Sequence, residues 1–114
     1  FETLMEQFAR GLPQKTTPIG VVLNPVIDDW HFASRHPAYQ ELIKTYGGLN
    51  ASLELERDSF RAFIRRHNWA SLDLCEAFGD NPAQYILPED GIHLNSAGHH
   101  LFAEEMFKIV AARL

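Results

Sequence analysis

The fold is decided by one short apolar stretch, Pro18-Ile19-Gly20-Val21-Val22-Leu23-Asn24-Pro25. A continuous run of aliphatic residues between two prolines predicts a β-strand that is buried on both faces. Such strands belong to parallel sheets that are covered by helices. We expect the strand to end at Asn24-Pro25, because proline has no N–H group to donate to a strand ladder.

Helical periodicity surrounds this strand. Apolar residues recur at steps of three and four in a predicted first helix that stops near Gly11: Phe1, Leu4, Met5 and Phe8. Two further helices are expected over residues 37–46 and 53–67, and either Asn50 or Ser52 is expected to cap the second. The strand is therefore followed by a helical connection rather than by a hairpin.

A second strand and a last helix complete the predicted order. Residues 69–74 predict the strand, and residues 97–114 predict the helix, after a cap at Asn95 or Ser96. A strand, a helical crossover and a second strand form a βαβ unit, which implies parallel pairing. Two strands make a poor independent sheet, because a continuous apolar strand needs a neighbour at each edge. We therefore expect residues 1–114 to be a single partial domain, the second half of an α/β domain.

Length and composition bound the class of protein. The 114 residues are 46% hydrophobic and 22% charged, as in an ordinary globular domain. Ten Lys and Arg against fifteen Asp and Glu give a charge of −5, which argues against a nucleic-acid partner. A single cysteine excludes an internal disulfide and a cysteine-based zinc site. Because the longest apolar runs are about five residues, we expect no membrane span.

The start of the chain points to a longer protein. The sequence opens on Phe1 rather than on Met, and it shows no signal peptide. We therefore expect a piece of a longer chain, whose cellular compartment stays open.

The richest chemistry lies in one loop ahead of the last helix, Asp90-Gly91-Ile92-His93-Leu94-Asn95-Ser96-Ala97-Gly98-His99. Asp90 and His93 stand three residues apart and can form a side-chain hydrogen bond. A carboxylate in that position fixes the tautomer of the imidazole and stabilises the imidazolium that forms when the ring takes a proton. Such a pair is the orienting half of a nucleophile–base–acid triad. The simpler interpretation of the same residues is a helix cap beside a solvated histidine.

The extended pattern, Asp-Gly-Ile-His-Leu-Asn followed by Gly98-His99, resembles the last sequence block of the SGNH/GDSL hydrolases. These proteins are serine esterases and lipases with a flavodoxin-like three-layer α/β/α sandwich of parallel strands. The resemblance implies that His93 is the general base and that Asp90 is its partner. It also implies an ester substrate, on a lipid or an acylated carbohydrate, and no cofactor. The flanking strands and helices follow the same order as in that family.

The chain departs from the family at the nucleophile. The family's serine lies in a Gly-Asp-Ser block, but here Gly79-Asp80 is followed by Asn81, and no Gly-Asp-Ser occurs. The oxyanion-hole glycine and the Gly-x-Asn-Asp block are also missing. Loss of a triad nucleophile lowers the rate by orders of magnitude, so we expect this chain alone to be nearly inert. Its expected partner is the missing N-terminal half of the domain, or a second copy of the chain along the strand edge.

A substrate-lining role is predicted for the residues that follow the first strand. In open α/β sheets, ligands bind outside the carboxyl ends of the strands. Asp28, Trp30 and His31 come directly after that end, so they are candidates to line the substrate site. Asp73, at the end of the second strand, is expected to accept hydrogen bonds in a structural turn rather than to act in catalysis.

Two other interpretations stay open. Asp90, His93 and His99 could together hold a metal ion, but no His-x-x-x-His pair accompanies them on one helical face, so we expect no metal. The alternative to an enzyme fragment is a non-catalytic α/β module that serves protein association. A Gly-Asp-Ser block in the parent sequence upstream of Phe1 would decide for the enzyme.

Overall fold

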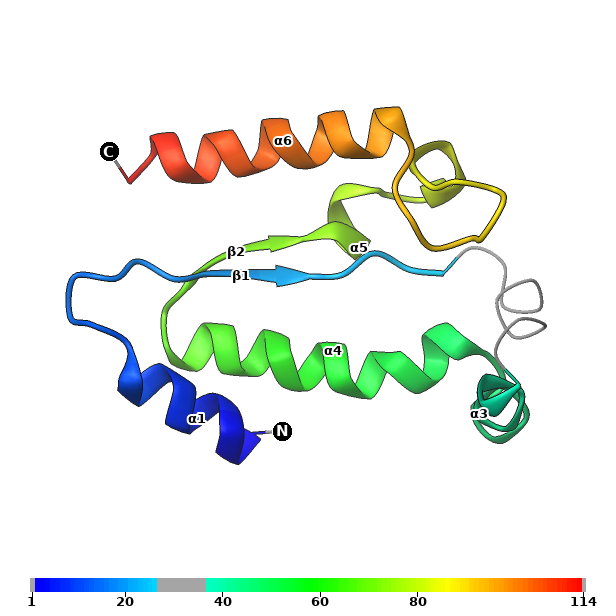
Figure 1. Cartoon of the computed structure of the whole chain (residues 1–114), viewed down its shortest axis with the longest axis horizontal. Coiled ribbons are helices and arrows are strands. Elements are labelled where there is room, and N and C mark those ends of the chain that lie inside the picture. The colour runs from blue at the N-terminus through cyan, green and yellow to red at the C-terminus, as the bar shows by residue number, and fades with distance from the viewer. Residues whose placement is uncertain (1, 27–36, 114) are drawn as a thin grey trace.

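The computed structural model describes residues 2–26 and 37–113, which form a two-stranded parallel sheet with helices around it (Figure 1). The elements in chain order are α1 (Glu2–Gly11), β1 (Ile19–Val22), α3 (Ala38–Tyr46), α4 (Leu49–Arg66), β2 (Ala70–Asp73), α5 (Leu74–Ala77), the 3-10 helix η1 (Pro82–Tyr85) and α6 (Ser96–Ala111). The mixed α/β class predicted from the sequence is confirmed. None of the helices in these two ranges is both long and apolar enough to cross a membrane.

The sheet has the parallel register that a βαβ unit requires. Ile19 pairs with Ala70 at one end of the ladder, and Val22 pairs with Asp73 at the other. Helices α3 and α4 connect the two strands, and in Figure 1 α4 lies along one side of the sheet while α6 lies along the opposite side. Both strands therefore run toward the same end of the molecule, where the loops that follow them meet.

The side of the sheet that faces α4 is closely packed. Val22 is 2% exposed, Ile64 on α4 is 4% exposed, and Phe63 is fully buried. The Phe63 ring also meets the edge of Trp69, with ring centroids 5.1 Å apart. Gly20 lets the helix approach the strand, because a Cβ there would overlap the side chain of Ile64.

The side that faces α6 holds the larger apolar cluster. It is formed by Leu72, Leu74, Phe78 and Ile86, each no more than 5% exposed. Helix α6 packs against this cluster with its apolar face, which is formed by Leu101, Phe102, Met106 and Ile109. Burial of one such side chain stabilises the folded state by about 1.5–3 kcal/mol, so this cluster is the main reason that α6 stays on the sheet.

One sequence expectation about apolar burial is wrong. The stretch around β1 is not buried on both faces, since Leu23 is 68% exposed. The predicted α1 forms, but its apolar stripe is largely open to solvent, with Leu4 at 71% and Phe8 at 57% exposed. The physical reason is common to both: within the described ranges β1 pairs with β2 alone, so nothing covers its other edge or the helix beside it.

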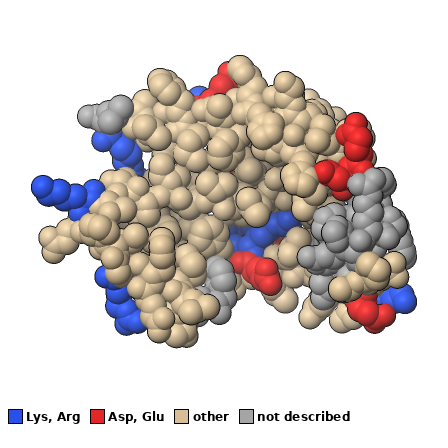
Figure 2. All heavy atoms as spheres, viewed as in Figure 1, with Lys and Arg blue, Asp and Glu red and all other residues tan. Residues whose placement is uncertain are grey.

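A cleft of about 370 Å³ lies beside β1. Its lining is mainly apolar and comes from three elements: Met5, Val21, Val22, Leu23, Leu53, Glu56, Arg57 and Phe60. The surface in Figure 2 is mostly uncharged, with a hollow near its centre where basic and acidic atoms are seen. The exposed edge of the sheet is thus bordered by an apolar cleft that has charged groups in its wall.

Several element boundaries differ from the sequence expectation, and β1 ends at Val22 rather than at Asn24-Pro25. Helix α4 begins at Leu49 after Gly48, so neither Asn50 nor Ser52 is its cap. Strand β2 ends at Asp73 rather than one residue later, because the Asp73 carboxylate accepts hydrogen bonds from the backbone N–H groups that begin α5. Helix α6 is shorter than expected and ends at Ala111, but Asn95 caps it as expected.

Candidate active site

Asp90 and His93 lie on a small loop whose two ends are joined. The Leu87 N–H donates to the His93 carbonyl at 2.8 Å, and Ile86 forms an antiparallel bridge with Leu94. Inside the loop the Gly91 N–H donates to the Leu87 carbonyl at 2.9 Å. Gly91 has a φ of 74°, a conformation that glycine adopts without strain. The Asp-Gly pair therefore forms the turn, in addition to the role predicted for Asp90 beside His93.

The Asp90 carboxylate organises the tip of this loop. Its Oδ1 accepts from the backbone N–H groups of Ile92 at 2.9 Å and of His93 at 3.0 Å. Its Oδ2 lies 2.5 Å from His93 Nδ1. The side-chain hydrogen bond expected from the sequence is present, and the imidazole is 77% exposed.

The same contacts determine the protonation of the pair. Hydrogen bonds from the backbone N–H of Ile92 and of His93, and then from the His93 ring, lower the pKa of Asp90 from 3.8 to about 2. Asp90 is therefore an ionised carboxylate at neutral pH and can only accept. The ring proton of neutral His93 must lie on Nδ1, so Nε2 carries the lone pair that can take a proton.

The loop is fixed to helix α6 by Asn95. The Asn95 side chain accepts from the Gly98 N–H at 2.9 Å and donates to the Gln84 carbonyl at 2.9 Å. Gly98 also allows a close approach, because a Cβ at this position would overlap the backbone carbonyl oxygen of Tyr85. Asn95 and Gly98, which belong to the sequence pattern that runs from Asp90 to His99, thus hold the loop against the helix.

The other side of the loop is tied to the carboxyl end of β1. The Asn24 Nδ2 donates to the Ile92 carbonyl at 2.9 Å, a contact between residues 68 positions apart. Asn24 lies two residues beyond the end of β1, so Asp90 and His93 lie beyond the carboxyl end of the parallel strands. Ligands bind at this edge in open α/β sheets.

The chain matches no protein-family model, and neither a curated protein nor a solved structure matches it. The assignment of roles in the loop therefore depends on the residues and contacts themselves.

The remaining site candidates divide into two groups. Asp28, Trp30 and His31 lie outside the described residues, so their predicted substrate-lining role stays a prediction. His99 is exposed in the first turn of α6. Across residues 2–26 and 37–113, no three His, Cys, Asp or Glu side chains are grouped to hold a metal ion, so Asp90, His93 and His99 do not form a ligand set.

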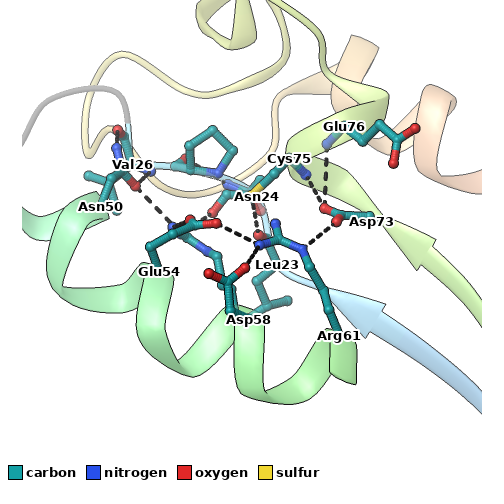
Figure 3. Close-up of polar contacts among 12 residues, drawn as sticks. Leu23, Asn24, Val26, Asn50, Glu54, Asp58, Arg61, Asp73, Cys75 and Glu76 are labelled. Atoms are coloured by element: carbon teal, nitrogen blue, oxygen red, sulfur yellow. Dashed lines mark hydrogen bonds and ion pairs between the residues drawn. The ribbon is translucent and has the colours of Figure 1, made fainter. Parts of the chain in front are cut away.

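Asp73 has the structural role expected of it. Its Oδ1 accepts from the N–H groups of Cys75 at 3.0 Å and of Glu76 at 3.4 Å, and its Oδ2 accepts from Arg61 Nε at 2.7 Å (Figure 3). The bond with Asp73, followed by that with Glu54, raises the pKa of Arg61 above its already high ordinary value. The Cys75 thiol donates to the Leu23 carbonyl at 3.1 Å, and burial raises the pKa of that thiol.

Sequence reasoning missed three polar residues near the end of β1: Asn24, Asn50 and Arg57. Asn50 forms two bonds with the backbone of Val26, donating at 2.6 Å and accepting at 2.8 Å. Arg57 is 8% exposed and donates to the Asn24 carbonyl at 3.1 Å. One signal was available, because Arg57 interrupts the apolar stripe of α4 at helical spacing from Leu53. A charge in such a stripe indicates a buried and paired group.

Proposed function

We propose that this chain supplies the Asp–His arm of a serine-type ester hydrolase, as the C-terminal half of a domain of the SGNH/GDSL type. The observation that carries the proposal is the 2.5 Å contact between Asp90 Oδ2 and His93 Nδ1 in a ring that is 77% exposed. A tight turn alone would account for the bonds to the Asp90 Oδ1. It does not account for an exposed imidazole that is held at Nδ1 by the second oxygen of the same carboxylate.

The chemistry of the proposed site follows from these positions. His93 Nε2 takes the proton of a serine hydroxyl as its oxygen attacks the ester carbonyl, and the ring becomes an imidazolium. The ionised Asp90 stabilises that cation and keeps Nε2 directed at the reacting atoms. The imidazolium then gives its proton to the leaving alcohol. The proposed substrate is an ester of a lipid or of an acylated carbohydrate.

The nucleophile of this proposed enzyme comes from outside the 114 residues. In the described ranges β1 has a strand neighbour on one edge only, and its second edge borders the apolar cleft. A further parallel strand on that edge would cover Leu23 and widen the sheet toward a flavodoxin-like three-layer sandwich. We propose that the nucleophile-bearing half of the same domain provides this strand. The carboxyl ends of all the strands would then meet at His93.

A non-catalytic association module is the second candidate function. The exposed apolar side chains around β1 and α1 favour it, because large apolar patches mark contacts between proteins. In that case the same edge binds a partner, while Asp90 and His93 carry no reaction. The two candidates therefore differ only in what His93 does.

Substitution of His93 separates these candidates. In the complete domain, meaning this chain together with the nucleophile-bearing half, we expect His93→Ala to lower kcat on a short activated ester by about 10³-fold or more. His100→Ala is the matched control, because His100 is 76% exposed and lies 2.9 Å from a carboxylate oxygen of Glu104. Equal activity of the two variants would reject the hydrolase and leave the association module.

The isolated chain provides the complementary measurement. We expect no esterase turnover above background from residues 1–114 alone, because they lack the Gly-Asp-Ser block. Hydrolysis by the isolated chain that a serine-directed phosphonate abolishes would mean that a nucleophile lies within these residues.

A further inference from the structure

We infer that Asn24 is a positioning residue, which sets the place of the His93 loop relative to the end of β1. The inference rests on the proposed function for its kinetic consequence, but its structural part stands by itself. It concerns a residue outside the Asp90–His93 pair and outside the loop that carries them.

Two carbonyl groups determine the orientation of the Asn24 side-chain amide. Its Nδ2 lies 2.9 Å from the Ile92 carbonyl oxygen and 3.2 Å from the Pro25 carbonyl oxygen. Both neighbours are acceptors, so the nitrogen rather than the oxygen of the amide must face them. An aspartate has the same shape but would turn a negative oxygen toward two carbonyl oxygens. Asn24→Asp is therefore a near-isosteric test of this donor.

The segment around Asn24 is itself held by polar side chains of α4. Arg57 donates to the Asn24 carbonyl at 3.1 Å and lies 3.5 Å from Asn50 Oδ1, while Asn50 bonds both backbone polar groups of Val26. The Asn50–Val26 bonds are visible in Figure 3, where Asn24 lies beside α4. Because Arg57 is 8% exposed, its charge is fixed in place rather than solvated. Helix α4 thus holds the strand end, and the strand end holds Ile92.

The hydrogen bonds that form the Asp90–His93 pair do not depend on Asn24. The bonds that Asp90 makes are local, to Ile92 and His93, and none of them involves Asn24. Loss of the Asn24 donor should therefore leave the Asp90–His93 pair formed but free to shift as a unit. A displacement of about 1 Å at a reacting group can cost about 100-fold in rate. The expected effect of Asn24 lies in the placement of His93 and not in its protonation.

Amide hydrogen exchange tests the structural part in the 114-residue chain. In Asn24→Asp we expect faster exchange of the Leu87 and Gly91 N–H groups, which bond within the loop, while N–H groups of α6 exchange as before. Asn24→Ala should give the same pattern more weakly, because it removes the donor without adding repulsion. Phe63→Leu, a core change on α4, is the control and should speed exchange throughout. Loop exchange that is unchanged in Asn24→Asp overturns the inference.

A double-substitution cycle in the complete domain tests the kinetic part. We expect Asn24→Ala to lower kcat by about 10- to 100-fold with KM little changed, and to cause no further loss when His93 is already Ala. A merely structural role would give the same loss in both backgrounds, which would overturn the inference. If His93→Ala itself leaves kcat unchanged, the proposed function fails, and the exchange measurement alone decides the position of the loop.

Discussion

Asp90 is the residue whose charge state the structure specifies best. Both of its oxygens accept hydrogen bonds, two from backbone N–H groups and one from the His93 ring. These bonds are stronger to the ionised form than to the protonated one, so they lower the pKa of Asp90 to about 2. The stabilisation that they give is complete above about pH 4, the ordinary pKa of an aspartate, and is lost as the pH falls through 2.

We expect the Asp90 carboxyl carbon to titrate with a midpoint near 2 when it is followed by NMR. His93→Ala should raise this midpoint only partly, because the backbone N–H groups of Ile92 and His93 are the larger causes of the shift and stay in place. A midpoint near the ordinary value of 3.8 in the unsubstituted chain would mean that the loop does not hold the carboxylate as described.

Residue-scale prediction from the sequence worked where the chemistry is local. Asp90 and His93 are three positions apart, so one turn can join them, and the same holds for the Asn95 cap of α6. It failed for Asn24 and Arg57, whose partners come from distant parts of the chain. A side chain that bonds a backbone carbonyl many positions away leaves no periodic trace in the sequence.

At the scale of elements, the junction between η1 and α6 depends on one glycine. Gly98 lies in the first turn of α6, against the Tyr85 carbonyl at the end of η1. In an open helix, alanine in place of glycine is stabilising by about 1 kcal/mol. Here the added Cβ would meet backbone, which cannot turn aside as a flexible side chain can.

We therefore expect Gly98→Ala to lower the free energy of unfolding by about 1–3 kcal/mol, as an overpacked site does. Chemical denaturation followed by circular dichroism measures this difference. The sign of the change in unfolding free energy is decisive. Helix propensity favours alanine at this position, whereas overlap of its Cβ with the Tyr85 carbonyl disfavours it. A more stable variant would show that α6 and η1 are farther apart than described.

Element order was predictable because the helices and strands have clear periods, but their boundaries and burial were not. Asp73 ends β2 one residue early because it caps α5, a short helix that the sequence analysis did not predict. The stripe of α1 predicted a helix without telling whether anything covers it. Burial depends on neighbours, and among the described residues β1 has a neighbouring strand on one edge only.

At the scale of the whole molecule, we expect the edge of β1 that no described strand covers to control association. Leu4, Phe8 and Leu23 are each more than half exposed. Burial of apolar surface is worth roughly 25 cal/mol per Å², so several hundred Å² left wet would forgo many kcal/mol. A domain has a net stability of only about 5–15 kcal/mol, so we expect the isolated chain to associate through this edge.

We expect sedimentation of the 114-residue chain at micromolar concentration to detect a dimer or larger species, and addition of the nucleophile-bearing half to replace it with a one-to-one complex. Leu23→Lys, which places a charge at the exposed end of the strand, should weaken both associations. A chain that melts cooperatively as a monomer, with no partner present, would contradict the half-domain prediction.

The parallel register has a consequence for the order in which the molecule folds. Pairing Ile19 with Ala70 closes a long segment of chain, and the entropy of that closure is lost before any strand bond forms. Helix α4 needs only local contacts and is expected to form early, so it shortens the segment that must be closed. The Asn24–Ile92 bond needs the sheet and the loop after it. We therefore expect the end of the molecule that holds the His93 loop to be assembled last and to open first when the fold is destabilised.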